Sequence, residues 1–135
     1  MTETLLDGNV LVALVIDTHV HHEAAHRWIA GRRRLRFATT TMTQGTLLRI
    51  HMTMASDRTA AAAWAQLSAV TAHPAHVFWP DAFPFDAVAH RHLQGPKQVT
   101  DAWLAEAARR RKGKLATFDT ALAALHGDVA ELLAA

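Results

Sequence analysis

The hydrophobic positions of the chain fall into short apolar runs that alternate with longer stretches of helical periodicity. Runs at 4–6, 36–40, 76–79 and 115–118 are bounded by polar or turn-forming residues, which is typical of buried strands. Between them the pattern predicts helices over 10–16, 20–30, 41–54, 58–70, 85–92, 100–111 and 120–125, with a strand or a frayed helix at 129–133. No hairpin signal separates two strands, so the chain predicts an α/β fold with a central parallel sheet covered on both faces.

Composition narrows the class of protein. Half of the 135 residues are hydrophobic and 19% are charged, so the chain is expected to fold as one domain over residues 1–135. The absence of cysteine excludes disulfides, Cys-based zinc sites and iron–sulfur clusters, and it suits a reducing compartment. No export signal and no apolar run of about 20 residues is found, so we expect a cytoplasmic protein that does not enter a membrane.

Positive charge is concentrated in two runs, although the net charge is only +2. One run contains Arg32, Arg33 and Arg34, and the other contains Arg109, Arg110 and Arg111. Such runs are often solvated helix ends. Two of them in one small domain also suit contacts with phosphates, and they are the predicted RNA-binding residues.

One carboxylate interrupts the first apolar run. An unpaired buried charge costs several kcal/mol, so Asp7 is expected at the end of a strand, followed by a turn at Gly8 and Asn9. Asp119 occupies the same position after the run at 115–118. If these parallel strands are neighbours, the two carboxylates lie about 5 Å apart at the carboxyl edge of the sheet. Asp101, in the first turn of the helix at 100–111, reaches that edge only if the preceding loop is suitably placed.

Each of these aspartates has a simpler explanation. Asp7 and Asp119 are good helix caps, and Asp101 is favourable with a helix dipole. Taken together, however, three carboxylates at one edge repel one another unless a cation lies among them. Carboxylate oxygens are hard ligands that suit Mg²⁺ or Mn²⁺.

These motifs resemble those of a known family. An aspartate in an N-terminal strand–turn–helix, Thr100-Asp101-Ala102-Trp103-Leu104, and Leu115-Ala116-Thr117-Phe118-Asp119 are similar to motifs of the PIN-domain ribonucleases. More narrowly they resemble the VapC toxins of bacterial toxin–antitoxin systems, and the resemblance covers nearly the whole chain.

The resemblance implies a three-layer α/β/α PIN fold and an endoribonuclease that depends on Mg²⁺ or Mn²⁺. The metal ligands would be Asp7, Asp101 and Asp119, and Thr117 and Gln44 would complete the catalytic set. The implied substrate is a structured RNA such as tRNA or rRNA. The implied partners are a VapB-type antitoxin and a second copy of the chain, in a homodimer or a toxin–antitoxin hetero-oligomer.

Gln44 departs from the family pattern, which usually has glutamate at this position. It also fits a capping box, because Thr41-Met42-Thr43-Gln44 has the Ser/Thr-x-x-Gln form. An amide binds a divalent cation more weakly than a carboxylate, so the number of metal ions is left open by the sequence.

Two other features admit alternative chemistry. His22 and His26 have the i, i+4 spacing of a zinc pair, although solvated histidines on a helix face are the simpler interpretation. Trp79, beside Pro80, could stack on a base at the surface, whereas Trp28, Trp64 and Trp103 are expected in the core or a dimer interface.

Two other functions are compatible with the sequence. A catalytically weak PIN domain that binds RNA or protein would explain Gln44. A phosphate- or nucleotide-binding α/β module with one Mg²⁺ ranks last, because the chain has no glycine-rich phosphate loop.

Overall fold

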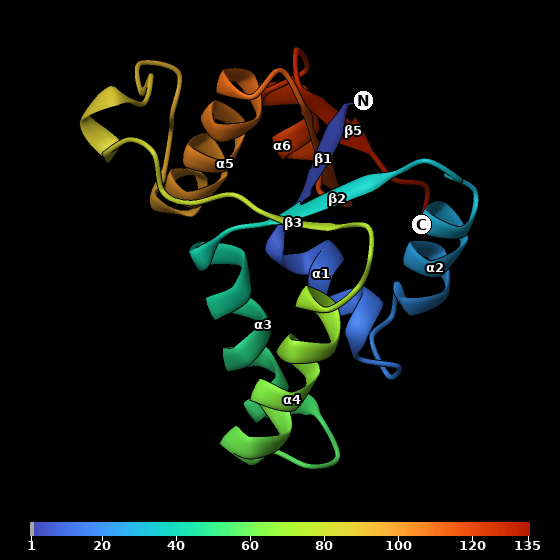
Figure 1. The fold of residues 1–135 in the computed structure, drawn as a ribbon. Helices are drawn as coiled ribbons and strands as arrows, with labels where there is room; N and C mark the ends of the chain where they lie inside the picture. Colours follow the sequence, from blue (N-terminus) through green and yellow to red (C-terminus); the bar gives the residue numbers. More distant parts are fainter. Residues whose placement is uncertain (1) are drawn as a thin grey trace.

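A five-stranded parallel sheet forms the centre of the molecule (Figure 1). The computed structural model describes residues 2–135. The strands are β1 (Glu3–Leu6), β2 (Arg36–Thr39), β3 (His76–Phe78), β4 (Lys114–Thr117) and β5 (Ala130–Leu132), and their order in the sheet is β3-β2-β1-β4-β5. All four neighbouring pairs are parallel, as the sequence pattern predicts.

Helices cover both faces of this sheet, so the predicted three-layer α/β/α fold is confirmed (Figure 1). The helices are α1 (Gly8–Val15), α2 (His22–Ala30), α3 (Thr41–Met54), α4 (Ala60–Thr71), α5 (Val99–Arg110) and α6 (Thr120–Leu125). Two adjacent residues of β1 divide the core: Leu5 packs with α5 and α6, and Leu6 packs with α1 and α3. This division follows from the alternation of side chains along a strand. Within residues 2–135, no helix combines the length and apolar character that a membrane span requires.

The strand order changes direction at β1. The chain adds β2 and β3 on one side of β1, and after α5 it crosses to add β4 and β5 on the other side. Helices therefore diverge from the carboxyl ends of β1 and β4, and a crevice at such a switch point is the usual site of ligand binding in open α/β sheets.

The structure contradicts two of the predicted local elements and decides between the two alternatives left open for 129–133. The predicted helix at 85–92 is wrong, because only a single 3₁₀ turn (Phe85–Ala87) forms there; the segment has few buried apolar positions, and Pro84 precedes the turn. The predicted turn at Gly8 and Asn9 is also wrong, since Asp7 caps α1 directly and the helix begins at Gly8. The segment at 129–133 forms the edge strand β5.

Gly113 lies between α5 and β4, where it packs closely against the start of β1 and against Trp79. A Cβ atom at this position would lie 2.5 Å from the backbone oxygen of Glu3 and 3.1 Å from Cη2 of Trp79. Trp79 is 1% exposed, so the prediction that it offers a surface for base stacking is wrong. Its indole N–H donates a hydrogen bond of 2.7 Å to Glu3.

We expect Gly113→Ala to lower the free energy of unfolding by about 1–3 kcal/mol, because the added methyl group meets backbone rather than a movable side chain. Urea unfolding followed by circular dichroism measures the change. Gly95→Ala is the matched control, since its Cβ would meet no heavy atom within 4 Å. Equal stability of the two variants would contradict the close approach.

Candidate active site at the carboxyl edge of the sheet

Asp7 lies directly beyond β1 and is almost completely buried, at 6% exposed. Its backbone N–H donates to the carbonyl of Ala116 at 3.0 Å, which extends the pairing of β1 with β4. Its Oδ1 accepts a hydrogen bond of 2.8 Å from the Val10 N–H, and its Oδ2 accepts one of 2.5 Å from the Thr117 hydroxyl. Burial raises the pKa of Asp7, while these two donors act in the opposite direction.

Thr117 links Asp7 to Asp119 through hydrogen bonds. Its side chain is fully buried at the end of β4, where its hydroxyl donates to Asp7 and accepts a hydrogen bond of 3.0 Å from the Asp119 N–H. The Oδ1 of Asp119 caps α6 by accepting from the N–H groups of Ala121 (2.8 Å) and Leu122 (3.2 Å). Asp7 and Asp119 are therefore helix caps and neighbours at the edge at the same time.

Asp101 completes the acidic group from the first turn of α5. Burial, together with the negative charges of Asp7 and Asp119, raises the pKa of Asp101 to about 6. The carboxylate of Asp119 likewise raises the pKa of Asp7. The structure thus brings the three aspartates within electrostatic reach of one another, from three separate segments of the chain.

The chemistry of these donors fits a divalent cation. Three hard carboxylates repel one another at neutral pH, and a cation would relieve that repulsion. Within residues 2–135, however, no three histidine or acidic side chains lie close enough together to hold one metal ion. The three aspartates would therefore have to move closer together than they lie in this structure to bind a single cation jointly.

Gln44 lies in the first turn of α3, which follows β2 at the same edge of the sheet. Its Nε2 donates a hydrogen bond of 3.0 Å to the Thr39 hydroxyl, which lies 2.7 Å from Nε2 of His76. Thr39 and His76, which hold this amide, were not predicted, because nothing in the sequence marks a contact between β2, β3 and α3. The predicted capping box of Thr41 and Gln44 is wrong.

The capping box of α3 forms one residue earlier. The Thr40 hydroxyl accepts from the Thr43 N–H at 3.2 Å, and the Thr43 hydroxyl accepts from the Thr40 N–H at 2.9 Å. Strand β2 ends at Thr39, whose carbonyl accepts a hydrogen bond from Trp79, so Thr40 is the first residue free to act as the cap. Gln44 therefore takes no part in capping α3.

The predicted RNA-binding arginines lie away from these acids. Arg32, Arg33 and Arg34 precede β2, while Arg109, Arg110 and Arg111 end α5 before β4. Both runs therefore lie toward the amino ends of the strands, at the edge opposite the aspartates (Figure 1). The structure does not bring either run together with the acidic group.

The histidines of the zinc alternative have another role. A ring nitrogen of His22 lies 2.7 Å from the Ala13 carbonyl, and one of His26 lies 2.9 Å from the Leu14 carbonyl. Both carbonyls belong to the last turn of α1, where carbonyls lack partners within the helix. These histidines therefore tie α2 to the end of α1.

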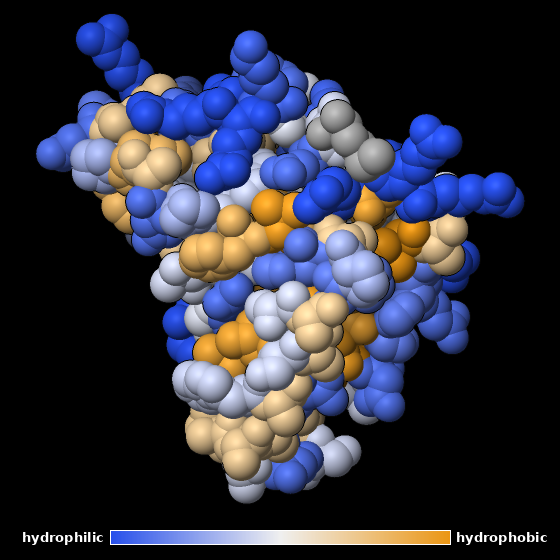
Figure 2. Space-filling view, viewed as in Figure 1, coloured by the Kyte–Doolittle hydropathy of each residue, from blue (hydrophilic) through white to orange (hydrophobic). Residues whose placement is uncertain are grey.

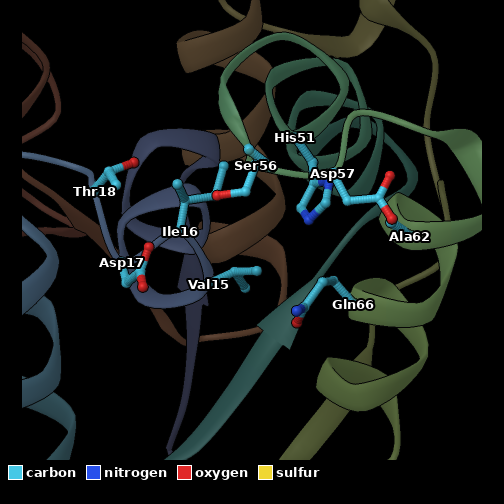
Figure 3. Close-up of a pocket in the computed structure, with 10 residues that line it drawn as sticks. Val15, Ile16, Asp17, Thr18, His51, Ser56, Asp57, Ala62 and Gln66 are labelled. Atoms are coloured by element: carbon cyan, nitrogen blue, oxygen red, sulfur yellow. The ribbon is translucent and has the colours of Figure 1, made fainter.

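A polar hollow of about 290 Å³ lies at the far ends of α1 and α3 (Figure 3). His51 is 6% exposed there, and its Nδ1 has no partner in residues 2–135. Asp17 and Asp57 also line the hollow. It lies beyond Val15, at the opposite end of α1 from Asp7, and so is separate from the acidic edge.

The fold agrees with the comparisons to known proteins. The chain matches the family model described as the PIN domain over residues 4–127. It is also 50% identical over 129 residues to ribonuclease VapC29 of Mycobacterium tuberculosis, a match covering 96% of this chain and 95% of the relative. The chain therefore belongs to the PIN-domain family, within its group of VapC ribonucleases, and the resemblance found in the sequence is confirmed.

Solved structures show the same fold at low sequence identity. The toxin VapC20 of Mycobacterium tuberculosis, described as cleaving the sarcin–ricin loop, superposes with a TM-score of 0.70 at 16% identity, covering 90% of this chain and 94% of that one. VapBC2 of Rickettsia felis, bound to a DNA fragment from its promoter, gives 0.67 at 11% identity, covering 98% of this chain and 100% of that one.

The raised pKa of Asp101 makes stability depend on pH. Between the ordinary pKa of 3.8 and the folded value of about 6, the folded state binds more protons than the unfolded state, so stability falls as pH rises through that range. We expect Asp101→Asn to be more stable than the parent at neutral pH without divalent ions, and this advantage to vanish near about pH 4. Urea unfolding across pH measures it. Asp81→Asn, at an exposed position, should show no such trend, and a destabilised Asp101→Asn at neutral pH would contradict the electrostatic coupling.

We expect Gln44→Glu to tighten Mn²⁺ binding by roughly one order of magnitude, because it adds a fourth carboxylate at the edge. Isothermal titration calorimetry measures the affinity. Gln66→Glu makes the same chemical change at an exposed position of α4 and should leave the affinity at this edge unaltered. An unchanged affinity in Gln44→Glu would remove Gln44 from the site.

Proposed function

We propose that this chain is the toxin of a type II toxin–antitoxin system and acts as a divalent-metal-dependent endoribonuclease on structured RNA. The observation that carries the proposal is the buried Asp7, held by Thr117 within electrostatic reach of Asp101 and Asp119. This group lies at the switch point of the sheet in a chain of the VapC group.

The reaction would be hydrolysis of a phosphodiester bond, in which water attacks phosphorus and the 3′ oxygen leaves. Mg²⁺ or Mn²⁺ held by Asp7, Asp101 and Asp119 would neutralise charge on the scissile phosphate and make water more acidic. Thr117 would fix the orientation of the Asp7 carboxylate through their hydrogen bond. Asp101, with a pKa of about 6, would be mostly protonated in mildly acidic solution and would then hold a cation poorly.

The proposed substrate and partners rest on the relatives. Cleavage of the sarcin–ricin loop is stated for VapC20, which supports a structured RNA such as rRNA or tRNA as the substrate. The VapBC2 structure supports a VapB-type antitoxin as the partner. A homodimer or a toxin–antitoxin hetero-oligomer is the proposed assembly.

A second candidate is a catalytically weak PIN domain that binds RNA or protein without cleaving it. Its support is Gln44, which places an amide where the family usually has a carboxylate and donates its N–H to Thr39. The two candidates differ in whether the chain cleaves RNA or only binds its ligand.

We expect Asp7→Asn to lower cleavage of structured RNA by at least about a hundredfold, because it removes a charge essential for holding the cation and orienting the phosphate. The fold should survive, since the asparagine oxygen can still accept from the Val10 N–H. Gel analysis of cleaved RNA with added Mn²⁺ measures activity, and thermal unfolding checks the fold.

Asp17→Asn is the control for this experiment, because Asp17 is exposed and lies beyond the opposite end of α1. It should cleave as the parent does. Full activity in Asp7→Asn, or cleavage that persists in a chelator, would reject the proposed mechanism. A parent that binds RNA without cutting it would favour the weak PIN domain.

A further inference from the structure

Basic side chains from both arginine runs gather at the amino edge of the sheet. We call this surface the basic rim; it consists of Arg32, Arg33, Arg34, Arg36, Arg111, Lys112 and Lys114. One hollow of about 500 Å³ is lined by Arg32–Arg34 together with Lys114, and a neighbouring hollow is lined by Arg111 and Lys112. Thr2 lines both hollows, so the two runs flank the start of β1. Figure 2 shows strongly hydrophilic side chains across this upper edge, several of them projecting from it.

Much of the positive charge on the rim is uncompensated. Arg32 forms an ion pair with Glu131. Within residues 2–135, the other six rim residues form no ion pair. The nearby Arg109 and Arg110, by contrast, form ion pairs with Asp128 and Glu106, so their charges are already neutralised within the protein.

Two of the rim arginines lie against buried or half-buried tryptophans. The Arg32 guanidinium lies 5.7 Å from the centre of the Trp28 ring, and that of Arg111 lies 5.0 Å from the centre of the Trp79 ring. Trp28 also donates to Glu131 at 2.9 Å, as Trp79 does to Glu3. These contacts hold both ends of the rim in place, which reduces the entropy lost when a ligand binds.

The composition of the rim favours nucleic acid over a membrane or a protein. The large exposed hydrophobic side chains lie in other segments of the described chain: Val20, Met52, Met54, Trp64, Phe78, Phe85, Val99 and Leu132. A membrane surface requires apolar anchors beside the charges, and protein interfaces usually contain aromatic or methionine anchors. A surface rich in arginine without such anchors suits a phosphate backbone.

The position of the rim separates it from the acidic edge. Each central strand has four residues, so about 13 Å of sheet lies between the two edges, and one phosphate cannot reach both. We infer that the basic rim binds the phosphate backbone of a structured RNA at nucleotides distant from the scissile bond. The identity of the ligand as RNA rests on the proposed function.

The test measures binding apart from cleavage. Arg33→Gln, Arg34→Gln and Lys114→Gln each remove one exposed cation from the rim. In the full chain carrying Asp7→Asn, each change should weaken binding of a fluorescent RNA hairpin severalfold. Each should also reduce the slope of log affinity against log salt concentration by about 0.9. Fluorescence anisotropy at several KCl concentrations measures both quantities.

Arg58→Gln is the matched control, because it removes one exposed cation before α4, outside the rim. It should leave affinity and salt slope unchanged. Equal affinity and slope in the rim variants and their parent, or no hairpin binding by the parent, would overturn the inference. If the rim substitutions weaken binding of a DNA duplex of the same sequence but not of the RNA hairpin, the rim is a DNA-binding surface. That result would also overturn the inference.

Cleavage of a short single-stranded RNA separates this inference from the proposed function. Such an oligonucleotide can reach the acidic edge without reaching the rim, so its cleavage by the parent tests the proposed function independently of the rim. If the parent cleaves and rim substitutions leave hairpin binding unchanged, the rim inference fails and the proposed function stands. If rim substitutions weaken hairpin binding and the parent cleaves no RNA, the rim inference stands and the proposed function fails.

Discussion

The hydrogen bond from the Thr117 hydroxyl to Asp7 is the interaction on which the candidate site depends. A carboxylate that is 6% exposed must find donors inside the protein, and the parallel register of β1 and β4 supplies one of them. Leu6 pairs with Ala116, so the next residues, Asp7 and Thr117, lie side by side at the edge. The same hydroxyl accepts from the Asp119 backbone and thereby fixes the start of α6. The pairing of β1 with β4 therefore places this one hydroxyl group where the start of α6 and the arrangement of the acids both depend on it.

The sequence allowed most of the fold and the acidic edge to be predicted, because both depend on local patterns. An apolar run followed by a single aspartate marked the ends of β1 and β4, and the parallel sheet then brought Asp7 and Asp119 to one edge. Which threonine caps α3 could not be predicted, because Thr39, Thr40 and Thr41 are chemically alike. The hydrogen bond from Trp79 to the Thr39 carbonyl keeps Thr39 in β2, so Thr40 becomes the cap. The loop before α5 was also beyond local rules, because a few tertiary contacts rather than periodicity determine its path.

The two edges of the sheet carry opposite charge for different structural reasons. The acids at the carboxyl edge come from helix starts, where the helix dipole and free N–H groups favour negative side chains. The cations at the amino edge come from the ends of helices and the loops that return to the sheet, where positive side chains are favoured. A parallel α/β topology therefore separates charge along the strands, so a small net charge conceals two strongly charged surfaces.

The contacts of Arg32 with Trp28 and of Arg111 with Trp79 have an optical consequence. The chain has no tyrosine and four tryptophans, so tryptophan dominates its near-ultraviolet emission. Two of the four lie beneath guanidinium groups of the basic rim, and each also donates to a glutamate. Movement of these charges changes the electric field across the indole rings. The native protein consequently contains built-in fluorophores at the edge opposite the acidic site, and their emission can report events there without any attached label.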